Sequence, residues 1–356
     1  MARLTSRLAI AITLASLGGP SVAIGQASGS AVGPAETGVI VSRPDPEGVP
    51  TKLTLGFYLM DIESIEDLKR EFTADLYVVA RWRDSRLALA DDAGEGAQRI
   101  LPLSKIWRPE IGIVNRRGIE FSLPQTARVD SKGNVEATQR LRGQFASLLD
   151  LRRFPFDRQE LEIQFVSYRY SSDELEIEPA RVLWREGFTA DGWQIGQPVS
   201  EVTPLEIPSA TGRAGLTLRV TAEREKTFYV LTMVLPLTLI ALMAWSVFWI
   251  DPSLLPSQLA IATASVFTLI AFRLSLKWSL PKVSYLTAAD TFVLAVTLLV
   301  FAALGETVVA GRFSKSGRDD LARTLDRWAR WIYLAALVII CLVTMASGPA
   351  TAVARP

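Results

Sequence analysis

The stretch "LRRFPFDRQELEIQF", residues 151–165, joins a short apolar turn to a strand-like pattern. It sets Pro155 between two phenylalanines and continues with Asp157. From there apolar and polar side chains alternate, which is typical of a half-buried β-strand. A turn that met only water would gain nothing from two large aromatic side chains, because they stabilise a fold only when they are buried. We therefore expect Phe154 and Phe156 to press against another apolar element.

Alternation with a period of two residues recurs from about residue 51 to residue 226. Residues 76–82, 160–170 and 215–225 read as strands, and "DSKGNV" at 130–135 reads as a hairpin turn. Many short strands with turns between them predict an antiparallel sandwich or barrel for this part of the chain.

The composition excludes several classes of protein. The 356 residues hold 38 Lys and Arg against 37 Asp and Glu, so a net charge of +1 gives no field that would attract nucleic acid. Histidine is absent, which removes Ser-His-Asp catalysis and His-ligated zinc. The single Cys341 permits neither an intrachain disulfide nor a Cys-rich metal site. We expect no metal and no cofactor, and a membrane-anchored enzyme is the least favoured alternative.

The N-terminus has the pattern of a secretory signal. Arg3 and Arg7 precede an apolar run from Leu8 to Leu17, and small residues follow, so residues 1–25 are predicted to be a signal peptide. Residues 26–50 are rich in Gly, Pro, Ser and Ala and are expected to form a flexible lead-in to the 51–226 domain.

Beyond residue 226 the composition becomes apolar. A membrane span needs roughly 20 predominantly apolar residues, and a buried helix of a soluble protein is the alternative for any one such segment. Several in succession behind an export signal exclude that alternative. We expect a membrane domain over 227–350, with helices at about 227–250, 253–276, 284–311 and 328–348.

Charge bias predicts the orientation of these helices. The segment 311–330 holds six Lys and Arg against three Asp, as a loop on the cytoplasmic side does. With the export signal, this places the β-domain and the C-terminus outside, in the periplasm if the membrane is a bacterial inner membrane. The second helix is rich in Ala, Ser and Thr, which indicates either close packing in lipid or a face turned to a water-filled pore.

An ordered set of motifs resembles one family. From about residue 51 to residue 350, the chain is similar to the pentameric ligand-gated ion channels of the Cys-loop receptor superfamily, and especially to their bacterial members. The motifs are "WRDSRL" (82–87), "IWRPEIGIVN" (106–115), "FPFDRQ" (154–159), "VLPLTLIA" (234–241), "FWID" (248–251) and "LPKVSY" (280–285). Ser147 and Leu161 stand where the superfamily has its paired cysteines, so packing must hold the loop.

The resemblance implies an all-β immunoglobulin-like sandwich followed by a four-helix transmembrane bundle, assembled as a homopentamer. In this family the loop at 154–159 couples the sandwich to the helices. Asp157 would pair with Arg224, and Asp67 would join them, so that swapping the charges of Asp157 and Arg224 restores what single reversals destroy; the alternative is a solvated turn aspartate. The residues assigned to gating by this resemblance are Asp67, Phe154, Pro155, Phe156, Asp157, Arg224, Pro281 and Lys282.

The family's ligand sites lie between subunits in a box of aromatic side chains. Tyr77 and Tyr168 stand where two such residues would be, although both also suit ordinary sheet positions. The segment 205–215, which would close the box, has no aromatic residue. A small-molecule ligand and protons both stay open as the stimulus, although Arg70 stands where the bacterial branch would have a proton-sensing acid, with Glu71 beside it.

By the family's register, the second helix lines a pore for inorganic ions. Five copies of Phe267 would form an apolar constriction that gates by dewetting, whereas a rotation by one position would present Thr263 or Thr268 instead. "LPSQ" at 255–258 lacks the glutamate ring of cation-selective relatives, which favours anions or poor discrimination. The expected pore-lining residues are Pro256, Ala260, Ala264, Phe267, Ala271 and Ser275 (or Leu274), with Lys277 and Arg273 at the outer mouth.

The sequence thus predicts a membrane channel, surrounded by lipid, that is opened by a small ligand or by protons. A periplasmic sensor of the same fold that does not conduct is the main alternative.

Overall fold

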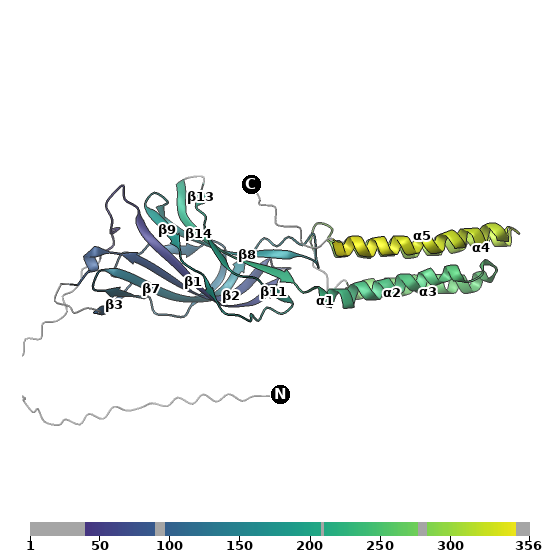
Figure 1. Ribbon diagram of the computed structural model, residues 1–356, viewed down its shortest axis with the longest axis horizontal. Helices are drawn as coiled ribbons and strands as arrows, with labels where there is room; N and C mark the ends of the chain where they lie inside the picture. Colours follow the sequence, from purple (N-terminus) through teal and green to yellow (C-terminus); the bar gives the residue numbers. More distant parts are fainter. Residues whose placement is uncertain (1–39, 90–96, 208–209, 277–282, 347–356) are drawn as a thin grey trace, which may run out of the picture. The chain divides into compact units, whose positions relative to one another are not determined.

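Two β-sheets form the first part of the chain in the computed structural model, which describes residues 40–89, 97–207, 210–276 and 283–346 (Figure 1). Their strands pair antiparallel except β9 and β10, which pair parallel with β1. The expected signal peptide at 1–25 and most of the 26–50 segment lie outside the described residues. The larger sheet has eight strands in the order β10-β1-β2-β7-β6-β3, with β5 on β7 and β9 on β1. Its strands are β1 (Thr51–Glu66), β2 (Glu71–Arg83), β3 (Gln98–Pro102), β5 (Arg116–Phe121), β6 (Thr126–Asp130), β7 (Asn134–Ala146), β9 (Leu175–Pro179) and β10 (Leu183–Trp184).

The second sheet has six strands in the order β11-β14-β8-β4, with β12 and β13 also paired to β14. Its long strands pair antiparallel in register, for example Leu218 with Ile163. The alternating sequence pattern is compatible with a sandwich or a barrel. The strands form two separate sheets, so this part of the chain is a sandwich. The strands are β4 (Ile111–Ile113), β8 (Arg158–Ser171), β11 (Trp193–Ile195), β12 (Val199–Val202), β13 (Leu205–Ile207) and β14 (Ala210–Arg224).

The core lies between the sheets because each long strand turns alternate side chains inward. On β1, Leu53, Leu55 and Phe57 are buried, and Phe57 meets Phe165 of β8 across the sandwich with ring centroids 4.9 Å apart. The indole Nε1 of Trp107 donates to the Tyr170 hydroxyl at 2.8 Å, so the polar ends of this aromatic core are partnered.

The hairpin turn read from "DSKGNV" joins β6 to β7. Gly133 has φ +79°, and a Cβ there would lie 2.4 Å from the carbonyl oxygen of Asp84. Glycine is required both for the left-handed backbone and for the close approach to the neighbouring 3₁₀ turn η1 (Ser85–Leu87).

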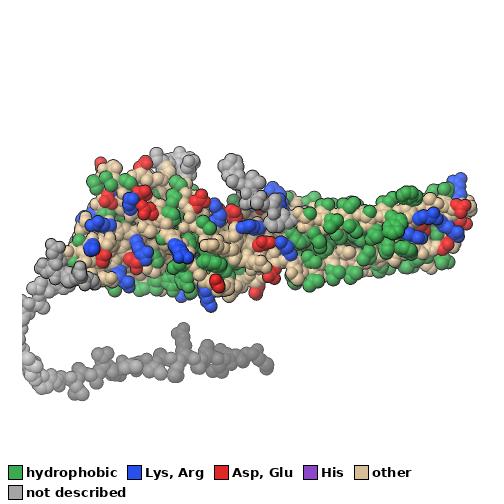
Figure 2. Space-filling model, viewed as in Figure 1, with side chains coloured by type: hydrophobic (Ala, Val, Ile, Leu, Met, Phe, Trp, Pro, Cys, Tyr) green, Lys and Arg blue, Asp and Glu red, His purple; other side chains and the backbone are tan. Residues whose placement is uncertain are grey.

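Four helical segments follow the sandwich, and all are long and apolar enough to cross a membrane. The first runs from Lys226 to Trp249 and combines α1 (Lys226–Tyr229), a π turn η2 (Val230–Val234), α2 (Leu235–Trp245) and a 3₁₀ turn η3 (Ser246–Trp249). The others are α3 (Leu255–Leu276), preceded by the 3₁₀ turn η4 (Pro252–Leu254), α4 (Ala288–Lys315) and α5 (Asp319–Ala346). Figure 2 shows apolar side chains over most of their visible surface, with charges gathered where α4 meets α5. The chain is therefore a multi-pass membrane protein.

The π turn has a cause in the sequence. Pro236 stands in the first turn of α2 and has no N–H to give to the carbonyl one turn earlier, so the preceding turn widens.

Three helix boundaries differ from the sequence expectation by four residues or more, and one of them is the end of the third helix, expected at 311 and found at Lys315. The expected start of the third helix at 284 moves to Ala288, because Thr287 and Asp290 form a capping box there. The expected start of the fourth helix at 328 moves to Asp319, because Asp319 and Asp320 suit the positive end of a helix. Most of the charged segment 311–330 is thus helical. The count of charged residues predicts on which side of the membrane a segment lies, but not whether it is a helix or a loop.

Candidate functional site

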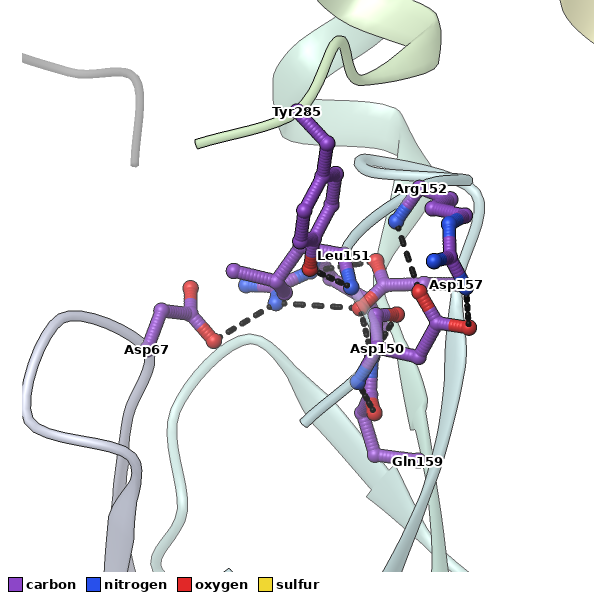
Figure 3. A network of polar contacts seen from close by, with 8 residues as sticks. Asp67, Asp150, Leu151, Arg152, Asp157, Gln159 and Tyr285 are labelled. Atoms are coloured by element: carbon purple, nitrogen blue, oxygen red, sulfur yellow. Dashed lines mark hydrogen bonds and ion pairs between the residues drawn. The ribbon is translucent and has the colours of Figure 1, made fainter. Parts of the chain in front are cut away.

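Arg224 ends β14 and, where the sandwich meets the helices, binds the carboxylates of Asp67 and Asp157. Figure 3 labels these two aspartates. Its Nε donates to Asp157 Oδ1 at 2.8 Å, and its Nη2 donates to Asp157 Oδ2 at 3.2 Å. The same Nη2 donates to Asp67 Oδ1 at 2.9 Å. Paired donation from one guanidinium to one carboxylate is among the stronger hydrogen-bond arrangements in proteins. We call Arg224, Asp157 and Asp67 the ion triad.

The ion triad is buried and partly surrounded by aromatic rings. The side chains of Arg224 and Asp157 are 4% and 2% exposed. The guanidinium carbon lies 4.1 Å from the ring centroid of Trp193 and 4.8 Å from that of Phe154. Burial opposes the charge, but the hydrogen bonds to Asp157 and Asp67 outweigh it and raise the pKa of the Arg224 guanidinium. The arginine is therefore a fixed positive charge in a dry environment.

Gln159 fixes the orientation of Asp157. Its Nε2 donates to Asp157 Oδ2 and, at 2.8 Å, to the carbonyl oxygen of Asp150. Its Oε1 accepts the Asp150 amide at 3.0 Å. One buried glutamine thus ties the start of the loop to the carboxylate at its end, as Figure 3 shows.

The loop also binds the segment that connects α3 to α4. The Tyr285 hydroxyl accepts the Leu151 amide at 3.0 Å. The first amides of α4, which have no partner within the helix, donate to loop carbonyls: Ala288 to Arg152 at 2.9 Å and Ala289 to Phe154 at 3.0 Å. A displacement of the loop must therefore act on the start of α4 through backbone hydrogen bonds.

The apolar residues of the loop are buried, and one of them meets the first membrane helix. Phe154 is 1% exposed and packs edge-on against Tyr229 of α1, with ring centroids 5.0 Å apart. Phe156 is 4% exposed, and Pro155 between them is buried too. The first membrane helix is thus the apolar element that Phe154 meets.

The structure brings four of the eight expected gating residues together. Asp67, Phe154, Asp157 and Arg224 are in contact, whereas Pro281 and Lys282 lie outside the described residues. Sequence reasoning missed several members of this contact. Tyr285 ends the quoted "LPKVSY" motif and Gln159 ends "FPFDRQ", so both could have been found there, but no sequence signal points to Trp193 and Tyr229.

The two tyrosines expected to bind ligand lie on different sheets of one subunit. Tyr77 is on β2, partly buried beside Tyr58, and Arg140 lies 5.5 Å from its ring centroid. Tyr168 is on β8 and 55% exposed. Its ring lies against Gly112, where a Cβ would be 2.0 Å from Cε2. One subunit does not bring them together, so only a site shared between subunits could use both.

One face of α3 is left uncovered by the other helices of the subunit. Pro256, Ala260, Ala264, Phe267, Ala271 and Ser275 are all exposed, as are Arg273 and Leu274. The alternative Thr268 is exposed as well, whereas Thr263 is only partly exposed. Pro256, Ala260, Ala264 and Phe267 line one shallow concave surface with Leu259 and Thr263. Lys277 lies outside the described residues.

Comparison with known protein families gives two matches that cover most of the chain. Residues 40–201 match the neurotransmitter-gated ion-channel ligand binding domain. Residues 233–343 match the neurotransmitter-gated ion-channel transmembrane region. The chain therefore belongs to the neurotransmitter-gated ion-channel family, the pentameric ligand-gated channels. This is a family of ion channels and not a class of enzymes, and a pentameric assembly is consistent with it.

Proposed function

We propose that this protein is a homopentameric channel in which the sandwich controls a central pore lined by α3. The observation that carries the proposal is a set of hydrogen bonds made by the loop that precedes β8, here taken as residues 151–157. These bonds join the loop to Tyr285 and to the first amides of α4. The loop is fixed to the sandwich through the ion triad and, through Tyr285, Ala288 and Ala289, to the start of α4, the helix that comes next in the chain after α3. A stimulus that displaces the sandwich would therefore be transmitted to the pore helix.

The uncovered face of α3 supports the assignment of the pore. A row of alanines on this face, with Phe267 among them, is left exposed by the described part of the subunit. If five subunits turn this face to a common axis, small side chains leave room for water and ions. Phe267 then forms the narrowest apolar ring.

The stimulus is proposed to be either a small molecule bound between sandwiches or protons. The purified protein in planar bilayers is the decisive preparation, and we expect current when the pH on the sandwich side is stepped from about 8 to about 4, a range in which carboxylates with raised pKa values titrate, or when a ligand is added. Absence of any current under both conditions would contradict the channel and favour a sensor that does not conduct.

The proposed location is the inner membrane of a bacterium, with the sandwich and the C-terminus in the periplasm. The excess of Lys and Arg between residues 311 and 330 supports this orientation. A protease added from outside to intact spheroplasts is expected to cut the sandwich, and protection of the sandwich would contradict the orientation.

The pore is predicted to prefer anions or to discriminate poorly. Gln258 is buried near the start of α3, and no acidic residue occurs in "LPSQ", so no negative ring is available there to hold cations. In a potassium chloride gradient the reversal potential is expected to lie at zero or towards the chloride potential. A reversal potential near that of potassium would contradict this prediction.

Tyr168 is predicted to contribute to ligand binding. Cation–π contacts are worth about 0.5–2 kcal/mol, so Tyr168→Ala is expected to shift the half-maximal concentration of a cationic ligand by about 2- to 30-fold. Gly112→Ala should act in the same direction, because its methyl group would displace the Tyr168 ring. Phe121→Ala is the matched control, since Phe121 is a similarly exposed aromatic residue on the other sheet. Equal shifts in Phe121→Ala and Tyr168→Ala would refute the assignment.

A further inference from the structure

Three polar side chains meet inside the helix bundle, away from the loop contact. Glu306 lies within α4 and Asp326 within α5, and their carboxyl groups are within interaction distance of each other. Gln258 of α3 approaches Asp326. Asp326 and Gln258 are each 1% exposed. We call these three side chains the acidic cluster.

The oxygen atoms of the acidic cluster lack hydrogen-bond donors. Both carboxylate oxygens of Glu306, both of Asp326 and Oε1 of Gln258 are buried, and no hydrogen bond from the described part of the chain reaches them. One N–H of the Gln258 amide donates to the carbonyl oxygen of Ile250 at 2.9 Å, and the second can only be offered to Asp326, which Gln258 approaches. Buried polar atoms are nearly always partnered, and one N–H cannot satisfy four carboxylate oxygens, so the cluster requires a further donor.

The nearest basic group is directed elsewhere. Arg330, one turn beyond Asp326 on α5, attracts its charge, but the Arg330 Nε donates to the carbonyl oxygen of Phe248 at 2.7 Å. Its guanidinium carbon lies 4.6 Å from the ring centroid of Trp249. Arg330 therefore moderates the negative charge without providing a hydrogen bond.

The other ionisable groups around the cluster do not supply a donor. Asp251, which precedes η4, repels Asp326 and is paired with Arg323 at 3.5 Å. Tyr333, two turns beyond Asp326 on α5, donates its hydroxyl to the carbonyl oxygen of Ala241 at 3.1 Å. Two ionised carboxylates held together in such a place would repel each other and lose their hydration.

A proton bound to the cluster supplies such a donor. A carboxyl group that carries a proton donates through its O–H to one acceptor, either an oxygen of the other carboxylate or Gln258 Oε1. One proton shared between two carboxyl groups also removes half of the negative charge, the arrangement used by paired carboxylates in enzymes.

We propose that Glu306, Asp326 and Gln258 form a proton-binding site that holds the start of α3 against α4 and α5. The site is distinct from the loop contact: Glu306 lies 17 residues beyond Ala289 on α4, about 26 Å at 1.5 Å per residue. In the orientation proposed above, it lies near the cytoplasmic side. Its control of the pore rests on the proposed function, because Gln258 belongs to the helix that would line the pore.

Infrared spectroscopy tests the site without any need for current. In the wild-type protein we expect the carbonyl band of a protonated carboxyl group at neutral pH, and its loss as the pH is raised. In Glu306→Gln and in Asp326→Asn the new amide donates to the remaining carboxylate, so the titration should move to lower pH, with at least about a tenfold loss of proton affinity. Asp320→Asn is the control, because Asp320 lies at the exposed start of α5, the helix that carries Asp326. This change should leave the band unchanged.

Several results would overturn the site. One is the absence of a protonated carboxyl band in the wild type at neutral pH, and another is an equal shift in Asp320→Asn. A third is a change in the carboxylate bands when sodium or calcium is added at constant pH, because a metal cation would then supply what the oxygens lack.

Current recordings test the regulation separately. In excised patches with the cytoplasmic face exposed, open probability is expected to change with pH on that face in the wild type and to lose this dependence in Glu306→Gln. A pH-insensitive current beside a positive infrared result would overturn the regulation while leaving the site. Absence of any current under any stimulus would instead count against the proposed function, and the infrared result would still decide the site.

Discussion

Replacement of Arg224 by glutamine is expected to abolish the response of the channel to its stimulus and to lower the stability of the contact between sandwich and helices. The change leaves Asp157 and Asp67 near each other without a cation, and Asp157 is almost fully buried. Breaking a buried pair by removal of one partner typically costs about 3–5 kcal/mol. Current recordings and thermal unfolding of the detergent-solubilised protein measure the two effects.

Arg219→Gln is the matched control for this change. Arg219 lies on the same strand and also contacts several carboxylates, among them Glu162 at 3.0 Å, but its side chain is 35% exposed. Exposed ion pairs contribute only about 0–1 kcal/mol. Similar losses in Arg219→Gln and Arg224→Gln would contradict a special role for the ion triad.

The structure modifies the expected result of a charge exchange. Asp157→Arg combined with Arg224→Asp restores the pair. However, it places the new aspartate beside Asp67, which in the unaltered protein accepts from Arg224 at 2.9 Å. We expect partial recovery of gating from the exchange and fuller recovery when Asp67→Asn is added. If the effects of the single changes simply add, the residues do not act as a unit and the pairing is refuted.

Phe267→Ser is expected to leave the channel open at rest. Phe267 is 67% exposed on the uncovered face of α3, and in a pentamer five rings would form the apolar constriction. A hydroxyl group there stabilises water in the constriction, so dewetting no longer blocks ions. The resting flux of ions from liposomes should rise by more than an order of magnitude.

Phe301→Ser provides the control for that experiment. Phe301 is also an exposed phenylalanine in a membrane helix, but it lies on α4. Its replacement should leave the resting flux unchanged. A leak in Phe301→Ser, or none in Phe267→Ser, would show that α3 does not line the pore with this face.

Much of the fold could be predicted from the sequence because its causes are local. Alternating side chains on strands such as β8 bury every second residue whatever the partner, and four long apolar segments cannot remain in water. The ordered motifs added the family, and with it the pairing of Asp157 with Arg224. Helix ends were harder, because the cap at Thr287 depends on a single hydrogen-bonded turn.

The sequence by itself determined the order of sandwich and helices and the absence of histidine chemistry, and its resemblance to the family pointed to the loop that we propose couples the two parts. Only the tertiary structure decided which distant side chains surround Arg224 and that the Tyr285 hydroxyl binds the loop. It also decided that Glu306 of α4 lies next to Asp326 of α5. The physical reason is that periodicity and composition report what one segment buries. The partner of a buried charge is decided by how separate segments pack.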